Sequence, residues 1–81
     1  MNLVLEHEQS GLRHYLDGRP VNCGTQLRLR VSGDRERESW VWARYEANLH
    51  PDRASVVLYT VFGRVIPDEC TFLRWPREDE R

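Results

Sequence analysis

The chain has 81 residues, of which 40% are hydrophobic and 31% are charged, and its formal net charge is −1. That length permits one small domain, and the near-neutral charge excludes a strongly basic nucleic-acid coat or an acidic tail. No apolar run approaches the roughly 20 residues of a membrane-spanning helix, and the first eight residues, with two Glu and no Arg or Lys, do not read as a signal peptide.

Short strands are predicted along the N-terminal half of the chain. Residues 2–6 and 12–16 form the first two, and Asp17-Gly18 signals a turn after them. Pro20 is expected to block immediate continuation into another strand, because proline lacks an N–H for the ladder. Residues 26–31 alternate apolar and polar without exception, which predicts a strand with one buried face.

Strand signals continue in the C-terminal half. Residues 32–38 are a charged loop, and residues 39–46 complete a hairpin with 26–31. Residues 55–62 are β-branched and aromatic with no charge, which predicts a central strand buried on both faces and ended by Gly63. A closing strand is expected over 70–75, and residues 77–81 are expected to fray as a charged tail.

Helix signals are nearly absent, so the predicted fold is all-β. Five or six short antiparallel strands with frequent turns favour a small SH3-like barrel over residues 1–76, since closure removes exposed sheet edges. The core is predicted from the apolar phase of each strand. Its members are Leu27, Leu29, Val31, Val41, Ala43, Tyr45, Leu58 and Leu73.

A set of short motifs resembles a bacterial family. They are Gly11, Tyr15, Gly18-x-Pro20-x-x-Cys23-Gly24, Leu27-x-Leu29, Trp40-Val41-x-x-Arg44-x-Glu46 and Leu58-Tyr59. The pattern is similar to the domain-of-unknown-function family numbered five-three-four-eight, often met near mobile elements. The chain departs from it at Asn22, where His is usual, at Thr25, where Asp is usual, and in an insertion at residues 35–38. The resemblance implies a compact β domain in a cytosolic bacterial or phage setting and transfers no catalytic residue.

The residues that could carry catalysis or bind metal lack the necessary spacing. Cys23, Cys70 and the three His form no C-x-x-C or H-x-x-x-H motif, so we expect no metal and no cofactor. Two cysteines are too few for a disulfide scaffold and suit a reducing cytoplasm, with both thiols free. We expect Cys23 to be buried beside a Gly turn and Cys70 to be a small core residue. The carboxylates lie in loops and tails among Arg, which does not indicate an enzyme.

The polar face of the central hairpin is the candidate binding surface. In-phase pairing places Trp40, Trp42, Arg44 and Glu46 on one face with Arg28 and Arg30 of the facing strand. All twelve basic residues are Arg, whose guanidinium stacks on aromatic rings and pairs with carboxylates or phosphates. The face is therefore either a binding site or a structural ladder in which Arg stems cover Trp rings.

Three functions fit the sequence. The first is a non-enzymatic protein-interaction module, which the near-neutral charge and Glu46 favour. The second is a small nucleic-acid-binding barrel that stacks bases on Trp40 and Trp42. The third, which rests on size and on the family resemblance, is a phage or plasmid accessory or inhibitor protein. We expect a protein partner, with nucleic acid second, no membrane, and a cytoplasmic location.

Overall fold

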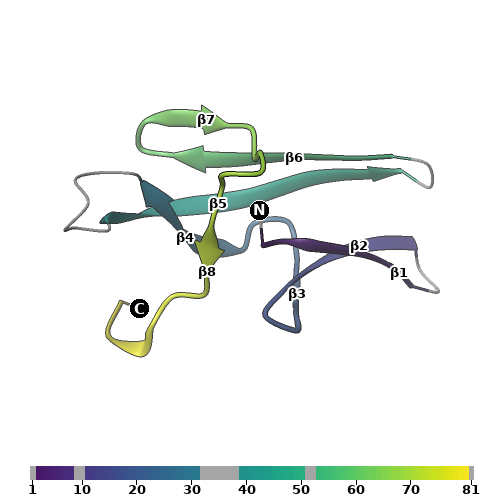
Figure 1. Cartoon of the computed structure of the whole chain (residues 1–81), viewed down its shortest axis with the longest axis horizontal. Coiled ribbons are helices and arrows are strands. Elements are labelled where there is room, and N and C mark those ends of the chain that lie inside the picture. The colour runs from purple at the N-terminus through teal and green to yellow at the C-terminus, as the bar shows by residue number, and fades with distance from the viewer. Residues whose placement is uncertain (1, 9–10, 32–38, 51–52, 81) are drawn as a thin grey trace.

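The computed structural model describes residues 2–8, 11–31, 39–50 and 53–80, and these ranges confirm an all-β chain (Figure 1). Its strands are β1 (Val4–Glu8), β2 (Gly11–Leu16), β3 (Arg19–Val21), β4 (Gln26–Val31), β5 (Ser39–His50), β6 (Arg53–Thr60), β7 (Gly63–Val65) and β8 (Leu73–Arg74). A 3₁₀ turn, η1 (Glu78–Glu80), follows them. The predicted loop over 32–38, with the insertion at 35–38, lies outside the described residues.

The strands form two antiparallel sheets that do not close into one barrel. The smaller sheet has the order β1-β2-β3, and the larger has the order β7-β6-β5-β4-β8, so β5 is its central strand. Figure 1 shows the smaller sheet as a separate ribbon beside the long β5–β6 hairpin, and β2 packs against β5. Both sheets keep open edges within the described part of the chain, and the closure expected of an SH3-like barrel is therefore not seen.

The hydrophobic core lies between the two sheets. Six of the eight predicted core residues are buried, namely Leu27, Leu29, Ala43, Tyr45, Leu58 and Leu73. The smaller sheet contributes Leu16 and Val21. Val31 and Val41 are only partly buried, because a cavity of about 370 Å³ opens beside them at the end of the β4–β5 hairpin.

The turn between β2 and β3 corrects the expectation about Pro20. Asp17 and Gly18 both have positive φ, 52° and 77°, which is the geometry of the tight hairpin turn that Asp-Gly favours. The chain consequently returns at once as β3, with Pro20 opposite Tyr15. β3 is an edge strand, where the missing N–H of proline costs no ladder hydrogen bond.

β6 lies between β7 and β5 in the sheet, but it is not buried on both faces. It ends at Thr60, and Val61 and Phe62 form an exposed turn to β7. Its outer face is open to solvent at Tyr59. The uncharged run in the sequence reports β propensity, which does not distinguish a strand covered on one face from a strand covered on two.

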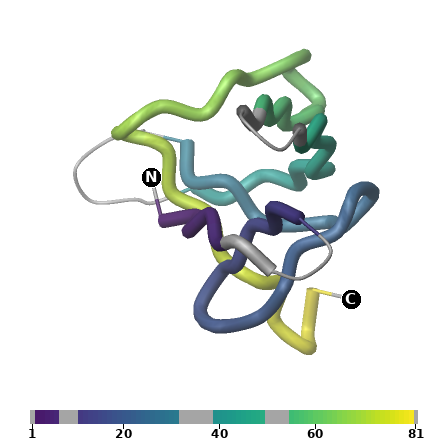
Figure 2. The backbone as a smooth tube through the Cα atoms, turned by 90° about the vertical axis from the view of Figure 1, so that its right-hand side faces the viewer, coloured from purple at the N-terminus to yellow at the C-terminus, as the bar shows by residue number. Residues whose placement is uncertain are grey.

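Glu80 accepts hydrogen bonds from the Arg74 side chain at 2.6 Å and from the Arg77 backbone N–H at 2.8 Å, so residues 77–80 are held against the sheet and are not the frayed tail predicted over 77–81. The Trp75 indole N–H donates to the Leu16 carbonyl at 2.8 Å, and the Asn2 side chain pairs with both backbone groups of Leu73. These contacts bring the two ends of the chain onto β8, which spans two residues of the closing strand predicted over 70–75. Figure 2 shows the C-terminal segment folding back beneath the sheets.

Candidate functional site: the tryptophan–arginine face

The face predicted from the sequence exists, and its register is the predicted one. β4 and β5 pair antiparallel with Arg28 opposite Trp42, Arg30 opposite Trp40 and Gln26 opposite Arg44. Successive side chains of a strand alternate between faces, so these residues lie on the side of the large sheet that faces away from the core. The structure therefore brings Trp40, Trp42, Arg28, Arg30 and Arg44 together, with Glu46 at one end.

Guanidinium groups stack on the aromatic rings of Trp40, Trp42, Tyr59 and Phe72 on this face. The Arg28 guanidinium carbon lies 4.5 Å from the Trp42 ring centroid, and that of Arg74 lies 4.8 Å from Trp40. Arg30 stacks in the same way on Phe72 at 4.3 Å, and Arg44 on Tyr59 at 5.1 Å. These contacts form a cross-strand ladder of cation–π pairs, each worth about 0.5–1 kcal/mol where exposed.

Glu80 occupies the centre of one half of the face. Its carboxylate accepts hydrogen bonds from Arg74 Nη1 at 2.6 Å and from Arg74 Nη2 at 3.0 Å. Arg28 Nε lies 2.9 Å from Glu80 Oε2, in an ion pair whose N–H direction does not make a hydrogen bond. The bonds from the Arg74 guanidinium and then from the Arg77 backbone N–H lower the pKa of Glu80 to about 2. The half of the face around Arg28 and Arg74 is thus occupied by the chain's own carboxylate.

The other half is open. We use the name open half for Trp42, Arg44, Glu46, Val57 and Tyr59. Trp42 and Tyr59 remain 40% and 39% exposed, which is high for large aromatic side chains. Arg44 and Glu46, two residues apart on β5, form a solvent-exposed ion pair at 3.2 Å. Such a surface pair contributes little to stability and can exchange for contacts with a partner.

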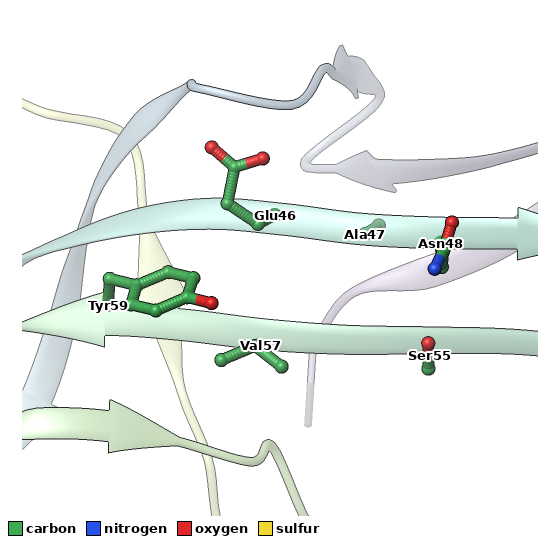
Figure 3. Close-up of a pocket in the computed structure, with 6 residues that line it drawn as sticks. All are labelled: Glu46, Ala47, Asn48, Ser55, Val57 and Tyr59. Atoms are coloured by element: carbon green, nitrogen blue, oxygen red, sulfur yellow. The ribbon is translucent and has the colours of Figure 1, made fainter.

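A shallow cavity of about 270 Å³ adjoins the open half (Figure 3). Glu46, Asn48, Ser55, Val57 and Tyr59 line it from β5 and β6, and Figure 3 shows their side chains rising from the same side of the two strands. The lining offers carboxylate, amide and hydroxyl oxygens around the Val57 methyl groups. It therefore suits hydrogen-bond donors that lie beside a small apolar contact with Val57.

One buried polar pair lies apart from this face, between the sheets. His14 Nδ1 and the Tyr45 hydroxyl are 2.6 Å apart, and both side chains are buried. Burial lowers the pKa of His14, while burial and then the Cys23 charge raise the pKa of Tyr45 to about 12. The alternation of Leu12, His14 and Leu16 is the sequence signal that places His14 on the inner face.

The two cysteines both lie at the surface. Both thiols are free as predicted, but Cys23 and Cys70 are exposed, so the prediction that both side chains are buried is wrong. Cys23 lies in the turn before β4, where its Sγ is 3.4 Å from the Ala47 backbone nitrogen and oxygen. Within the described ranges, no group of three or more His, Cys, Asp or Glu is placed to hold a metal ion.

Sequence reasoning missed four members of the face: Tyr59, Phe72, Arg74 and Glu80. Tyr59 and Arg74 follow from strand phase once the pairing of β6 with β5 and of β8 with β4 is known. Phe72 precedes β8, and its carbonyl accepts the Arg30 N–H at 3.0 Å. No local signal in the sequence indicates that Glu80 returns to Arg28, which is 52 positions away.

Comparison with known proteins adds no relative: no family model, no curated protein and no solved structure matches the chain. The resemblance described from the sequence motifs therefore stays an expectation. Among the described residues, no helix is long and apolar enough to cross a membrane.

Proposed function

We propose that this chain is a non-enzymatic protein-interaction module and that its partner docks on the open half of the tryptophan–arginine face. The observation that carries the proposal is the unequal use of that face. Glu80 fills the half around Arg28 and Arg74, whereas Trp42 and Tyr59 stay about 40% exposed beside Arg44. Tyr, Trp and Arg are the residue types that contribute most of the binding energy at protein interfaces.

The chemistry of the open half favours a partner with an apolar anchor side chain and nearby hydrogen-bond donors. Trp42, Tyr59 and Val57 supply apolar area, and Tyr and Trp lose little conformational entropy when they are covered. Glu46 and the oxygens of Asn48 and Ser55 accept hydrogen bonds at the rim. A carboxylate in that position repels phosphates and attracts Arg, Lys or backbone N–H groups.

Nucleic acid is the second candidate, because the same face holds two Trp rings and several guanidiniums on which bases and phosphates can bind. Glu80 weighs against it, since its carboxylate engages Arg28 and Arg74 and leaves fewer cations for phosphates. Single-stranded binding would appear as quenching of Trp fluorescence by a dodecamer of thymidine. Its affinity would fall with salt by about 0.7 per contacted phosphate on a log–log plot.

Selection from a library of random 12-residue displayed peptides tests the proposal, and it does not require the partner protein to be identified. We expect enriched peptides that share an apolar or aromatic residue next to Arg or Lys. Their binding should fall at least tenfold in Trp42→Ala and in Tyr59→Ala. Both side chains are partly exposed, so neither substitution should unfold the domain, and thermal melting verifies this.

Val61→Ala is the matched control, because Val61 is 85% exposed in the β6–β7 turn and lines neither the open half nor its cavity. Equal binding by wild type and Val61→Ala, with loss in Trp42→Ala, supports the proposal. Peptides that bind all three proteins equally would contradict it.

Three broader statements belong to the same proposal. The short antiparallel strands around one small core support a relation to SH3-like barrels. The motifs around Gly18, Cys23 and Trp40 support an origin in bacteria or mobile elements, including a role as a phage or plasmid accessory protein. Two free cysteines support a cytoplasmic location.

A further inference from the structure

The edge of β6 is open over most of its length. β7 pairs only with Leu58, Tyr59 and Thr60, and the remaining stretch of β6, from Arg53 to Val57, has no strand beside it on that edge within the described residues. Five residues of strand present about 16 Å of backbone, with alternate residues directing N–H and C=O groups outward. An open edge of this kind is a template for another strand.

The edge has none of the usual protection over its central part. Ser55, Val56 and Val57 carry no charge and no proline, and β6 is regular there. Beyond Val65 the chain leaves the edge at Ile66-Pro67, where Pro67 has no N–H to continue the ladder. The position that would extend β7 along Arg53–Val57 is therefore not filled by the described part of this chain.

An apolar cavity of about 480 Å³ adjoins the same stretch of edge. It lies between the sheets and is lined by Leu3, Leu5, His14, Val56, Ile66 and Pro67, with Ser55 and Val57 at its border. Leu5 and Ile66 are 42% and 68% exposed at its mouth. A volume of this size holds two or three apolar side chains and belongs to the range of ligand-binding pockets.

The juxtaposition of edge and cavity favours an extended chain as the occupant. A strand added to β6 satisfies the outward backbone groups, and its alternate side chains then point toward the inner side, where the cavity lies. A small molecule would leave the backbone groups unpaired. A second copy would need to bury on the order of 1,200 Å² or more for a stable dimer, which an edge of five residues does not supply.

We propose that an extended segment of a partner protein, with apolar residues at positions i and i+2, adds as a strand to β6 at Arg53–Val57. Its two apolar side chains fill the cavity between Leu5, Val56 and Ile66. Backbone pairing supplies affinity and the cavity supplies selectivity for apolar residues. This site shares Val57 with the open half, but it lies at the sheet edge and reaches inward, whereas Trp42 and Tyr59 lie on the outer face.

The test uses the blocked peptide acetyl-Lys-Thr-Val-Thr-Val-Thr-Lys-amide and ¹⁵N-labelled full-length chain. Titration is followed by amide chemical shifts, and amide hydrogen exchange is measured with and without peptide. We expect shift changes and slower exchange at alternate amides of residues 53–57, together with shifts at residues 5 and 66. The same peptide methylated at its five central backbone nitrogens should bind at least tenfold more weakly, because it lacks the N–H donors.

Two variants separate the cavity from the rest of the surface. Ile66→Ala removes an exposed side chain at the cavity mouth and should weaken the peptide at least threefold without unfolding the chain. Val61→Ala, which alters a more exposed apolar residue outside the cavity, should leave affinity unchanged.

Four results would overturn the proposal. The first is an absence of amide shift changes at residues 53–57 up to about 2 mM peptide, and the second is an affinity of the methylated peptide equal to that of the unmethylated one. The third is a set of shift changes confined to Trp42 and Tyr59. The fourth is a free chain that is already dimeric, with its β6 edge amides protected from exchange. Shifts confined to Trp42 and Tyr59 would leave the function proposed for the open half unaffected. Conversely, failure to select any peptide whose binding depends on Trp42 would leave the edge site unaffected.

Discussion

The hydrogen bond between His14 and Tyr45 joins the two sheets, and removing it should measurably destabilise the domain. Tyr45→Phe deletes the hydroxyl that lies 2.6 Å from His14 Nδ1 and keeps the ring in the core. Because both groups are buried, the ring nitrogen is then left without a partner, which costs about 1–3 kcal/mol. That is a large share of the roughly 5–15 kcal/mol by which small domains are stable.

Urea unfolding followed by Trp fluorescence measures this loss. A domain of this size has an m-value of about 1 kcal/mol/M, so the midpoint should fall by about 1–3 M. Tyr59→Phe is the matched control, since it removes a hydroxyl from an exposed ring and should change stability by less than about 0.5 kcal/mol. The double variant His14→Leu/Tyr45→Phe should recover part of the loss, because it leaves no unpaired polar group. Equal midpoints for Tyr45→Phe and Tyr59→Phe would refute the assigned role of the bond.

Three further measurements examine the core and the ionisable groups. Leu58 is fully buried, so Leu58→Ala should lower the free energy of unfolding by about 2–5 kcal/mol. Val61 is exposed, so Val61→Ala should change it by less than about 0.5 kcal/mol. A melting curve that neither substitution changes would show that the assigned strand phase is wrong. Burial lowers the pKa of His14 below 6.5, so the imidazole takes up a proton in the unfolded chain before it does so in the folded chain. The free energy of unfolding should therefore fall as pH drops below about 6.5, and His14→Leu should flatten this part of the pH profile. The pKa of Glu80 is lowered to about 2 from 4.5, so its contribution to stability is present above pH 4.5 and is lost as pH falls toward 2. Glu80→Gln should remove this pH dependence, and it should strengthen binding of a thymidine dodecamer severalfold because it releases Arg28 and Arg74. An acid stability profile that Glu80→Gln leaves unaltered would contradict the ion-pair assignment.

The tryptophan–arginine face could be predicted from the sequence because its main determinant is local. Strict alternation over residues 26–31 and the aromatic run at 40–42 fix the phase of two strands that are neighbours in the chain, and an antiparallel hairpin then determines which residues are opposite each other. The same local reasoning identified six of the nine hydrophobic core residues that are buried in the described part of the chain.

The features that could not be predicted depend on contacts between distant parts of the chain. Glu80 reaches Arg28 and Arg74 only because the last residues turn back beneath β8. The edge at Arg53–Val57 is open because β7 ends at Val65. Pro67 is a signal for that end, but the sequence does not show that this segment pairs with β6. For Cys23 and Cys70, the general tendency of cysteine toward burial was a poor guide, since both lie in turns.

A comparison of two ligands on one surface tests the proposed protein-binding role most directly. Dissociation constants of a selected displayed peptide and of a thymidine dodecamer are measured at about 150 mM salt on wild type, Trp42→Ala and Val61→Ala. We predict a micromolar peptide complex that Trp42→Ala weakens at least tenfold and Val61→Ala does not change, with the oligonucleotide weaker than about 100 μM. A micromolar oligonucleotide complex that Trp42→Ala abolishes without unfolding the chain, together with no peptide binding, would contradict the proposal and identify the face as a nucleic-acid site.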